Sequence, residues 1–314
     1  MQIFRDWRAV PEAARGAAVA LGNFDGVHLG HAKVIAAAHA ALPNAPLAVL
    51  TFEPHPRELF RPEDPPFRLT LSEERAAALA ALGVGMVYEL TFDWPFSELS
   101  AEDFVVQVLR AGIGARHLAS GPDFAFGHRR GGDVRFLARR AEELGIGASI
   151  VPLLTDAEGP ISSTRIRRLL QEGYPERAAV ELGRPWAIRG PVIEGDRRGR
   201  TLGFPTANMA LGRHLEPARG VYAVSVRLPD ATEVPGVANI GRRPTVGGGS
   251  ASRLEAHLFD FSADLYGQDL AVALKTYLRP ERRFPDLAAL RAQIAADALE
   301  ARRLCRRTDL VPGS

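Results

Sequence analysis

Short apolar runs alternate with helix-length segments along the first half of the chain. Runs of this kind are typical of buried strands. They predict strands at 17–21, 47–52, 84–90, 117–120 and 148–152. The segments between them predict helices at 30–41, 72–82, 101–111 and 133–144, with Ser72 as the N-cap of the second. This alternation predicts an α/β fold with a parallel sheet covered by helices on both faces.

The pattern changes near Gly183. Strand-like runs separated by Gly and Pro clusters follow, at 186–194, 220–228, 232–239, 253–261 and 269–278. A single helix is predicted after them, at 286–303. Strands without intervening helices indicate an antiparallel arrangement, so we expect a small closed all-β barrel with a C-terminal helix. We therefore assign residues 1–183 to a first domain and 184–310 to a second.

Composition limits the classes of function. The 314 residues include 39 basic and 37 acidic ones, which gives a net charge of +2. Two of the basic residues, Lys33 and Lys275, are lysines, so 39 − 2 leaves 37 arginines. The near balance argues against a dedicated nucleic-acid binder, and no apolar run approaches the roughly 20 residues that span a bilayer. The sequence does not indicate an oligomeric state.

Cysteine content and the N-terminus indicate a compartment. Cys305 is the only cysteine, which excludes a disulfide framework and a cysteine-based zinc site. The first twelve residues lack the pattern of a signal peptide. We therefore expect a cytoplasmic protein.

A turn with two histidines joins the first predicted strand to the first predicted helix. It contains Gly22, Asn23 and Asp25 and leads to His28 and His31. Ligands of open α/β sheets bind beyond the carboxyl ends of strands, and a helix N-terminus there attracts anions. The two imidazoles, three residues apart, can donate to phosphate oxygens as charge builds on them.

Gly30, between the histidines, would let a nucleotide approach the backbone closely. Two interpretations of this turn other than phosphate binding remain open. Paired histidines also serve as zinc ligands, although no His-Glu-x-x-His frame is present. A structural turn with incidental histidines is the third interpretation.

A second group of polar residues opens a helix further along the chain. Ser163 and Thr164 stand at its start, with Arg167 one turn later on the same side. Hydroxyls and a guanidinium that converge in this way suit a triphosphate. The alternative is an ordinary capped helix with a solvated arginine.

The second half carries a loop rich in glycine and arginine, which ends in a Pro-Thr-Ala-Asn tetrapeptide. Its backbone could wrap phosphates. The candidates in this loop are Gly195, Arg197, Gly199 and Arg200. Thr206 and Asn208 are two apart on an extended segment, so they face one side and offer neutral oxygen ligands to Mg²⁺ held with ATP. A solvated turn is the alternative for the loop.

These strings together resemble the bacterial bifunctional riboflavin kinase/FAD synthetase family. The resemblance is carried in the first half by 22–31, 51–56, 121–127 and 161–167, and in the second half by 195–208, 220–223, 237–245, 254–258 and 278–284. It covers nearly the whole chain, from about residue 16 to 303. Asp123 stands where some members of the family carry Asn. The resemblance implies a Rossmann-like nucleotidyltransferase domain followed by a Greek-key barrel kinase domain.

The resemblance also implies the chemistry. The barrel would phosphorylate riboflavin with MgATP to FMN, with Glu255 as the general base. The α/β domain would adenylate FMN with a second ATP to FAD and pyrophosphate, with His28 and His31 stabilising the phosphoryl group. The region 278–284 and the last helix would close over riboflavin. No cofactor other than Mg²⁺ is implied.

Two other functions stay open from the sequence. One is a different nucleotidyltransferase of the His-x-Gly-His class, against which the Pro-Thr-Ala-Asn barrel argues. The other is a non-enzymatic regulator that binds flavin or RNA, which would bind without turnover.

Overall fold

The computed structural model describes residues 1–194, 204–244 and 250–306. Contacts divide the chain into two compact units. The first comprises Met1–Pro65 with Thr70–Ser162, and the second comprises Pro66–Leu69 with Ser163–Ser314. In the described residues no helix is long and apolar enough to cross a membrane.

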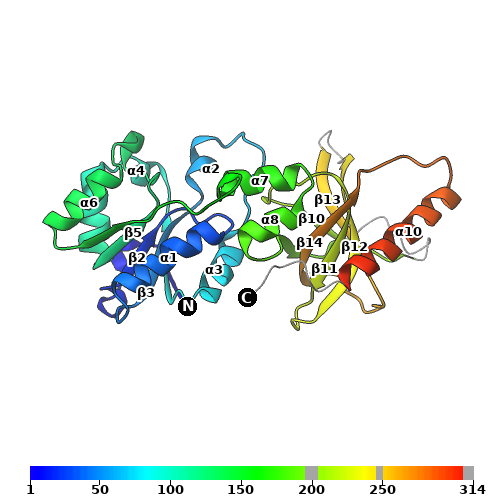
Figure 1. Cartoon of the computed structure of the whole chain (residues 1–314), viewed down its shortest axis with the longest axis horizontal. Coiled ribbons are helices and arrows are strands. Elements are labelled where there is room, and N and C mark those ends of the chain that lie inside the picture. Colours follow the sequence, from blue (N-terminus) through cyan, green and yellow to red (C-terminus); the bar gives the residue numbers. More distant parts are fainter. Residues whose placement is uncertain (195–203, 245–249, 307–314) are drawn as a thin grey trace. The chain divides into compact units, whose positions relative to one another are not determined.

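Six parallel strands form the sheet of the first unit, in the order β1-β4-β3-β2-β5-β6. Figure 1 labels β3, β2 and β5 of this sheet. They are β1 (Gln2–Phe4), β2 (Ala18–Leu21), β3 (Leu47–Glu53), β4 (Met86–Thr91), β5 (His117–Ser120) and β6 (Gly147–Ile150). The five predicted strands are confirmed, and β1 was not predicted. The chain leaves β2 toward β3 on one side, while β5 pairs with β2 on the other. The carboxyl ends of β2 and β5 are therefore the switch point of the sheet, where ligands of such sheets bind.

Helical segments cover the two faces of this sheet. They are α1 (Leu29–Ala41), α2 (Pro56–Phe60), α3 (Ser72–Ala81), α4 (Trp94–Ser97), α5 (Ala101–Asp103), the π-helix η3 (Phe104–Gly112) and α6 (Val134–Glu143), with single turns η1 (Trp7–Ala9), η2 (Glu12–Ala14) and η4 (His128–Arg130). The small hairpin β7 (Thr155–Asp156) and β8 (Gly159–Pro160) completes the unit. Successive residues of a strand point to opposite faces of the sheet. Ala18 and Ala20 therefore pack in the core on the α1 side, and Val19 packs in the core on the η3 side.

The start of α3 differs from the sequence prediction. Leu71 is the N-cap residue, and Ser72 is the first residue of the helix. The Ser72 hydroxyl donates to the buried Glu89 instead of capping the helix. The Leu71 backbone N–H is satisfied by the Glu74 carboxylate at 2.7 Å. The prediction of Ser72 as N-cap was therefore wrong, because a tertiary partner competes for its hydroxyl.

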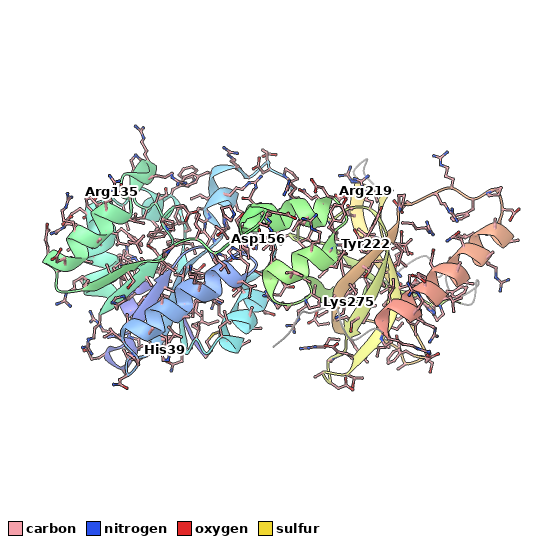
Figure 2. All side chains as sticks on the ribbon, in the orientation of Figure 1. His39, Arg135, Asp156, Arg219, Tyr222 and Lys275 are labelled. Carbon is pink, nitrogen blue, oxygen red and sulfur yellow. The ribbon has the colours of Figure 1, made fainter. Side chains whose placement is uncertain are left out.

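The second unit is built on a six-stranded antiparallel sheet in the order β10-β13-β12-β11-β14-β9. The strands are β9 (Ala187–Pro191), β10 (Ala207–Ala210), β11 (Gly220–Arg227), β12 (Glu233–Pro244), β13 (Ser250–Leu258) and β14 (Asp269–Arg279). The two edges meet through a bridge between Ile193 and Asn208, with a 2.8 Å hydrogen bond. The predicted barrel is confirmed, and Tyr222 lies fully buried inside it (Figure 2).

Helices within the described residues accompany the barrel. They are α7 (Ser163–Gln171), α8 (Pro175–Leu182) and α10 (Leu287–Cys305). The apolar side of α7 shares one buried cluster with Trp186 and the barrel interior. On the outer face of the sheet, Ala298 and Ala301 of α10 pack against Val221 and neighbouring residues. Figure 1 shows α10 alongside β11 and β12. Apart from Pro66–Leu69, the compact units divide between residues 162 and 163. The predicted boundary between two functional domains at 183/184 stays a prediction.

Candidate active sites

The turn between β2 and α1 is buried and strained. Phe24 and Val27 have φ values of 50° and 44°, a region that bulky and β-branched residues rarely adopt. The Asp25 carboxylate, 2% exposed, accepts from the backbone N–H of Thr70 at 3.0 Å. The Thr70 hydroxyl accepts from the Gly26 N–H at 2.9 Å. Asp25 therefore holds the turn in its strained form, and its contact with a nucleotide stays a prediction.

The two histidines of the turn cap each other. His28 is the N-cap of α1, and its Nδ1 accepts from the His31 backbone N–H at 3.3 Å. In return, Nδ1 of His31 accepts from the His28 backbone N–H at 3.3 Å. The rings stack with centroids 3.6 Å apart and 18° between planes. Because each Nδ1 accepts a hydrogen bond, each neutral ring carries its proton on Nε2, where it is a donor.

Gly30 lies close to the His28 ring in the turn. A Cβ there would lie 3.0 Å from Cε1 of His28 and 3.4 Å from the carbonyl oxygen of Ile161. The missing side chain therefore makes room for the His28 imidazole, while the Ile161 carbonyl would be at ordinary contact distance. Close approach of a nucleotide at this glycine stays a prediction.

The other residues predicted at this edge follow β2 and β5. The carbonyl of Asn23 accepts from the Thr51 hydroxyl at 2.9 Å, which ties the turn after Gly22 to β3. The carboxylate of Asp123 folds over Gly121, where a Cβ would meet its Oδ1 at 2.9 Å. Because β2 and β5 are parallel neighbours, the residues that follow them emerge at the same edge of the sheet.

Two exposed aromatic rings stand at the same edge and were not predicted as site residues. Phe60, 52% exposed, ends α2 after β3, and Trp94, 59% exposed, begins α4 after β4. Their ring centroids are 5.8 Å apart in an edge-to-face arrangement. Their sequence signal was a pair of aromatics shortly after two predicted strands.

Ser163, Thr164 and Arg167 belong to the second compact unit. Ser163 is the first residue of α7, and Thr164 beside it is exposed. The Arg167 guanidinium donates from Nε to the carbonyl of Phe67 at 2.9 Å and lies over the Phe67 ring. The predicted convergence of these three residues with the histidine pair stays a prediction.

In the barrel, three polar residues form a row across neighbouring strands. Asn208 of β10 is the direct partner of Glu255 on β13, and Glu255 is the direct partner of Asn239 on β12. Directly opposite residues of an antiparallel pair point to the same face, with Cβ atoms about 5 Å apart. Sequence analysis identified Asn208 and Glu255 but missed Asn239, because register was needed to bring it to this row.

The amide of Asn208 leaves an oxygen atom unused. Asn208 is 5% exposed, and its Nδ2 donates to the backbone carbonyl of Thr206 at 3.3 Å. Its buried Oδ1 has no hydrogen-bond partner among the described residues. Burying an amide oxygen without a partner is costly. The oxygen is therefore suited to bind a cation or to accept a hydrogen bond from a substrate. Within the described residues, no cluster of three or more His, Cys, Asp or Glu is placed to hold a metal ion.

The segment before β10 is held next to Glu255. Nδ1 of His257 lies 2.9 Å from the carbonyl oxygen of Pro205, and Phe204 packs edge-on against the His257 ring. His257 is two residues from Glu255 on the same strand face, so β13 positions both the carboxylate and the Pro-Thr-Ala-Asn segment. Gly195, Arg197, Gly199 and Arg200 lie outside the described residues.

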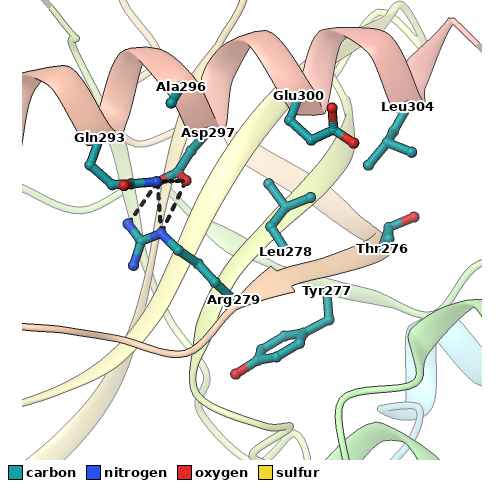
Figure 3. A pocket seen from close by; sticks show the side chains of 9 residues that line it. All are labelled: Thr276, Tyr277, Leu278, Arg279, Gln293, Ala296, Asp297, Glu300 and Leu304. Carbon is teal, nitrogen blue, oxygen red and sulfur yellow. Dashed lines mark hydrogen bonds and ion pairs between the residues drawn. The ribbon is translucent and has the colours of Figure 1, made fainter.

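A cavity of about 470 Å³ lies between β14 and α10 (Figure 3). Arg279 borders it and makes a bidentate ion pair with Asp297 of α10, with Nε and Nη2 at 3.0 and 2.6 Å from the two carboxylate oxygens. Gln293 donates to Asp297 at 2.7 Å. Tyr277 also borders it, but its ring points away from α10 (Figure 3) and packs edge-on against Tyr222 of the barrel core. The cavity therefore has a fixed, polar rim.

Known proteins resemble the chain over nearly its full length. The FAD synthetase family model matches residues 10–165, and the riboflavin kinase model matches residues 182–305. A "bifunctional riboflavin kinase/FMN adenylyltransferase" of Escherichia coli (strain K12) is 41% identical over 305 residues, 96% of this chain and 97% of the relative. Proteins of the same name from Pseudomonas fluorescens and Bacillus subtilis are 42% and 37% identical, over 97% and 93% of this chain and 98% and 93% of theirs.

A solved structure has the same fold. The crystal structure titled "Macrolide-efflux Protein from Streptococcus pneumoniae" matches with a TM-score of 0.86 and 31% identity, over 96% of this chain and 98% of that one. Fold and matches together define a class: proteins that join an FAD synthetase part to a riboflavin kinase barrel. The chain belongs to the bifunctional riboflavin kinase/FMN adenylyltransferase family. The resemblance stated from the sequence is thereby confirmed.

Proposed function

We propose that this chain phosphorylates riboflavin with ATP to FMN and ADP, and then transfers AMP from a second ATP to FMN, giving FAD and pyrophosphate. The two family models and the names of the relatives support both reactions. The observation that carries the kinase assignment is the unused, buried oxygen of Asn208 directly opposite Glu255. The first reaction is assigned to residues 184–310 and the second to residues 1–183.

In the kinase reaction, Glu255 acts as the general base. The 5′-hydroxyl oxygen of the ribityl chain attacks the γ-phosphorus of ATP, the bond from that phosphorus to ADP breaks, and the hydroxyl proton passes to the Glu255 carboxylate. Thr206 and Asn208 would hold Mg²⁺, which supplies positive charge to the phosphate oxygens. The glycines and arginines at 195, 197, 199 and 200 would surround the phosphates. A carboxylate is adequate as a base because positioning and charge dominate phosphoryl transfer.

The flavin of this reaction is proposed to lie on the outer face of the sheet. Glu255 and Arg279 belong to one row across β13, β12, β11 and β14. Three strand spacings separate them by roughly 14 Å, the scale of a ribityl chain joined to a three-ring isoalloxazine. The cavity under α10 is at the Arg279 end of this row, so the rings would enter there with the terminal hydroxyl at Glu255.

In the adenylyltransferase reaction, the histidines act as hydrogen-bond donors. A phosphate oxygen of FMN attacks the α-phosphorus of ATP, and the bond from that phosphorus to pyrophosphate breaks. Nε2–H of His28 and of His31 would donate to oxygens of the α-phosphate as charge builds on them. Neither ring has to gain or lose a proton. The paired Nδ1 caps support this role, because they fix the proton on Nε2.

Other residues would complete the adenylyltransferase site. Ser163, Thr164 and Arg167 are assigned to the triphosphate, because two hydroxyls and a guanidinium on one side of a helix start suit its oxygens. Gly22, Asn23, Asp25, Gly30 and Asp123 are assigned to the substrates. The exposed rings of Phe60 and Trp94 offer apolar surface of the kind an isoalloxazine would cover.

The proposed partners are small molecules: riboflavin, FMN, FAD and ATP with Mg²⁺. We propose that the protein acts in the cytoplasm, where these substrates are present and where a lone thiol such as that of Cys305 stays reduced. Neither nucleic acid nor a membrane is required by the proposed reactions.

The test supplies the full chain with riboflavin and MgATP and separates the products by chromatography. FMN and FAD should both form, and the absence of both would refute the proposal. Glu255→Ala and Glu255→Gln should reduce FMN formation at least 100-fold while adenylylation of supplied FMN continues. Glu233→Gln, on an exposed carboxylate paired with Arg227 at the other end of β12, is the matched control and should change neither reaction. Loss of both reactions in Glu255→Gln would contradict separate sites.

A further inference from the structure

The connection from β14 to α10 carries a carboxylate that the proposed mechanism does not use. Oε1 of Glu281 accepts a hydrogen bond from Nδ2 of Asn239 at 3.1 Å. Asn239 lies on β12, two strands away from β14 in the sheet. The connection therefore reaches past β11 on the outer face, between the Arg279 end of the row and Glu255.

The sheet is shaped to receive this carboxylate. Gly241 follows Asn239 by two residues on β12, so both face outward. A Cβ at Gly241 would lie 2.3 Å from Oε1 of Glu281, 3.0 Å from its Cδ and 3.1 Å from its Oε2. Any other residue at 241 would displace the whole carboxylate, so glycine makes this contact possible.

The contact fixes the orientation of the Asn239 amide. An ionised carboxylate only accepts hydrogen bonds, so the amide must present its NH₂ group to Glu281. The carbonyl oxygen Oδ1 of Asn239 is thereby turned away from Glu281. Within the described part of the chain, no hydrogen bond to that oxygen is found, and it stands one strand from Glu255.

A flavin bound as proposed must pass this oxygen. Its terminal hydroxyl would be at Glu255 on β13, and its rings would be at the cavity beyond β11, so the chain of secondary hydroxyls crosses β12. We propose that Glu281 is a positioning residue: it holds the Asn239 amide so that Oδ1 accepts a hydrogen bond from a secondary hydroxyl of the ribityl chain. The inference rests on the proposed kinase function. It predicts that the kinase site prefers flavins whose N10 side chain carries several hydroxyl groups.

The experiment compares two substrates in the full-length enzyme. One is riboflavin, and the other is a flavin whose N10 chain is an unbranched alkyl group with a terminal hydroxyl and no secondary hydroxyls. Glu281→Ala should lower kcat/KM for riboflavin about tenfold, the scale of one hydrogen bond, and leave kcat/KM for the hydroxyalkyl flavin within twofold. Continued turnover of the second substrate also shows that the barrel is folded.

Three further variants test the route through Asn239. Glu281→Gln retains an oxygen that can accept from Asn239 and should keep the wild-type preference. Gly241→Ala and Asn239→Ala should each reduce the preference as Glu281→Ala does, and combining Asn239→Ala with Glu281→Ala should add less than twofold. Equal losses on both substrates, no loss on either, or a Glu281→Gln variant as poor as Glu281→Ala would overturn the inference. If the wild-type enzyme forms no FMN, the proposed function itself fails, which is a separate result.

Discussion

The mutual capping of His28 and His31 allows structure and chemistry to be separated at one residue. Nδ1 of His28 accepts from the His31 backbone, while the proposed donor to the α-phosphate is Nε2. Asparagine places an oxygen at the position of Nδ1 and has nothing at the position of Nε2. Glutamine does the reverse, since its terminal amide reaches the ε position but offers no acceptor at δ. His28→Asn and His28→Gln are therefore a matched pair.

The two interactions differ in magnitude. Loss of an N-cap costs about 1 kcal/mol, so His28→Gln should lower the stability of the first turn of α1 by that amount. Loss of a donor to a developing phosphate charge typically costs about 10²- to 10³-fold in rate. His28→Asn should therefore keep most of the cap but lose at least 100-fold in adenylylation, and His28→Gln should retain at least tenfold more rate than His28→Asn.

Two measurements on the full chain test this separation. Adenylylation of supplied FMN gives the rate, and hydrogen exchange of the α1 backbone amides gives the local free energy of opening. Riboflavin phosphorylation is the internal control and should not change in either variant. An Asn variant with near-normal adenylylation would refute the donor role, and equal rates for Asn and Gln would refute the assignment of the roles to the two nitrogens.

Two other predictions concern a buried oxygen and a half-buried imidazole ring. Asn208→Leu removes the unpartnered Oδ1, so FMN formation should fall at least 100-fold. The melting temperature should stay the same or rise, because a buried unsatisfied acceptor is destabilising. A normal rate of FMN formation would exclude Asn208 from the site. Burial lowers the pKa of His117, so below about pH 6.5 the unfolded chain binds a proton that the folded chain does not. Stability of the first unit, followed by urea unfolding, should therefore fall as the pH drops below this value, and His117→Gln should remove part of that fall; an unchanged pH profile would refute it.

Local patterns in the sequence predicted the elements of the fold well. The buried strand β2 and the first part of β3 are apolar runs, the Ala-rich composition identified α1, and the amphipathic period identified α6. The pairing of His28 with His31 also follows from helical spacing, because residues three apart share a side. Each of these features is determined by the residues of a single continuous segment.

Features that depend on two distant segments were less accessible. The opposition of Asn208 and Glu255 is a matter of strand register, and the sequence suggested it only through family resemblance. The Ser163 and Thr164 start identified the helix α7, but not that Ile166 and Leu169 would pack with Trp186 in the barrel core. An apolar stripe specifies that a helix is covered, not which core covers it.

The contact between Glu281 and Asn239 shows the same limit inside a recognised motif. Both residues lie in segments that resemble the family, yet nothing in either segment indicates that they touch. The only sequence trace is the glycine at 241, and a glycine in a strand has many explanations. The geometry identifies the one that applies here, because the Glu281 carboxylate occupies the place of the missing side chain.

The arginine excess acquires a physical explanation from the pairs that the structure shows. Arg75, 1% exposed, lies between Glu53 and Glu89 at 3.0 and 2.9 Å, and Arg279 is held by Asp297. A buried guanidinium is tolerated only when carboxylates satisfy it, so arginines of this kind organise the protein and do not attract phosphate. The proposed phosphate contacts use other arginines, Arg167, Arg197 and Arg200, together with neutral donors and a metal ion, so a nearly neutral chain can still bind polyanionic substrates locally.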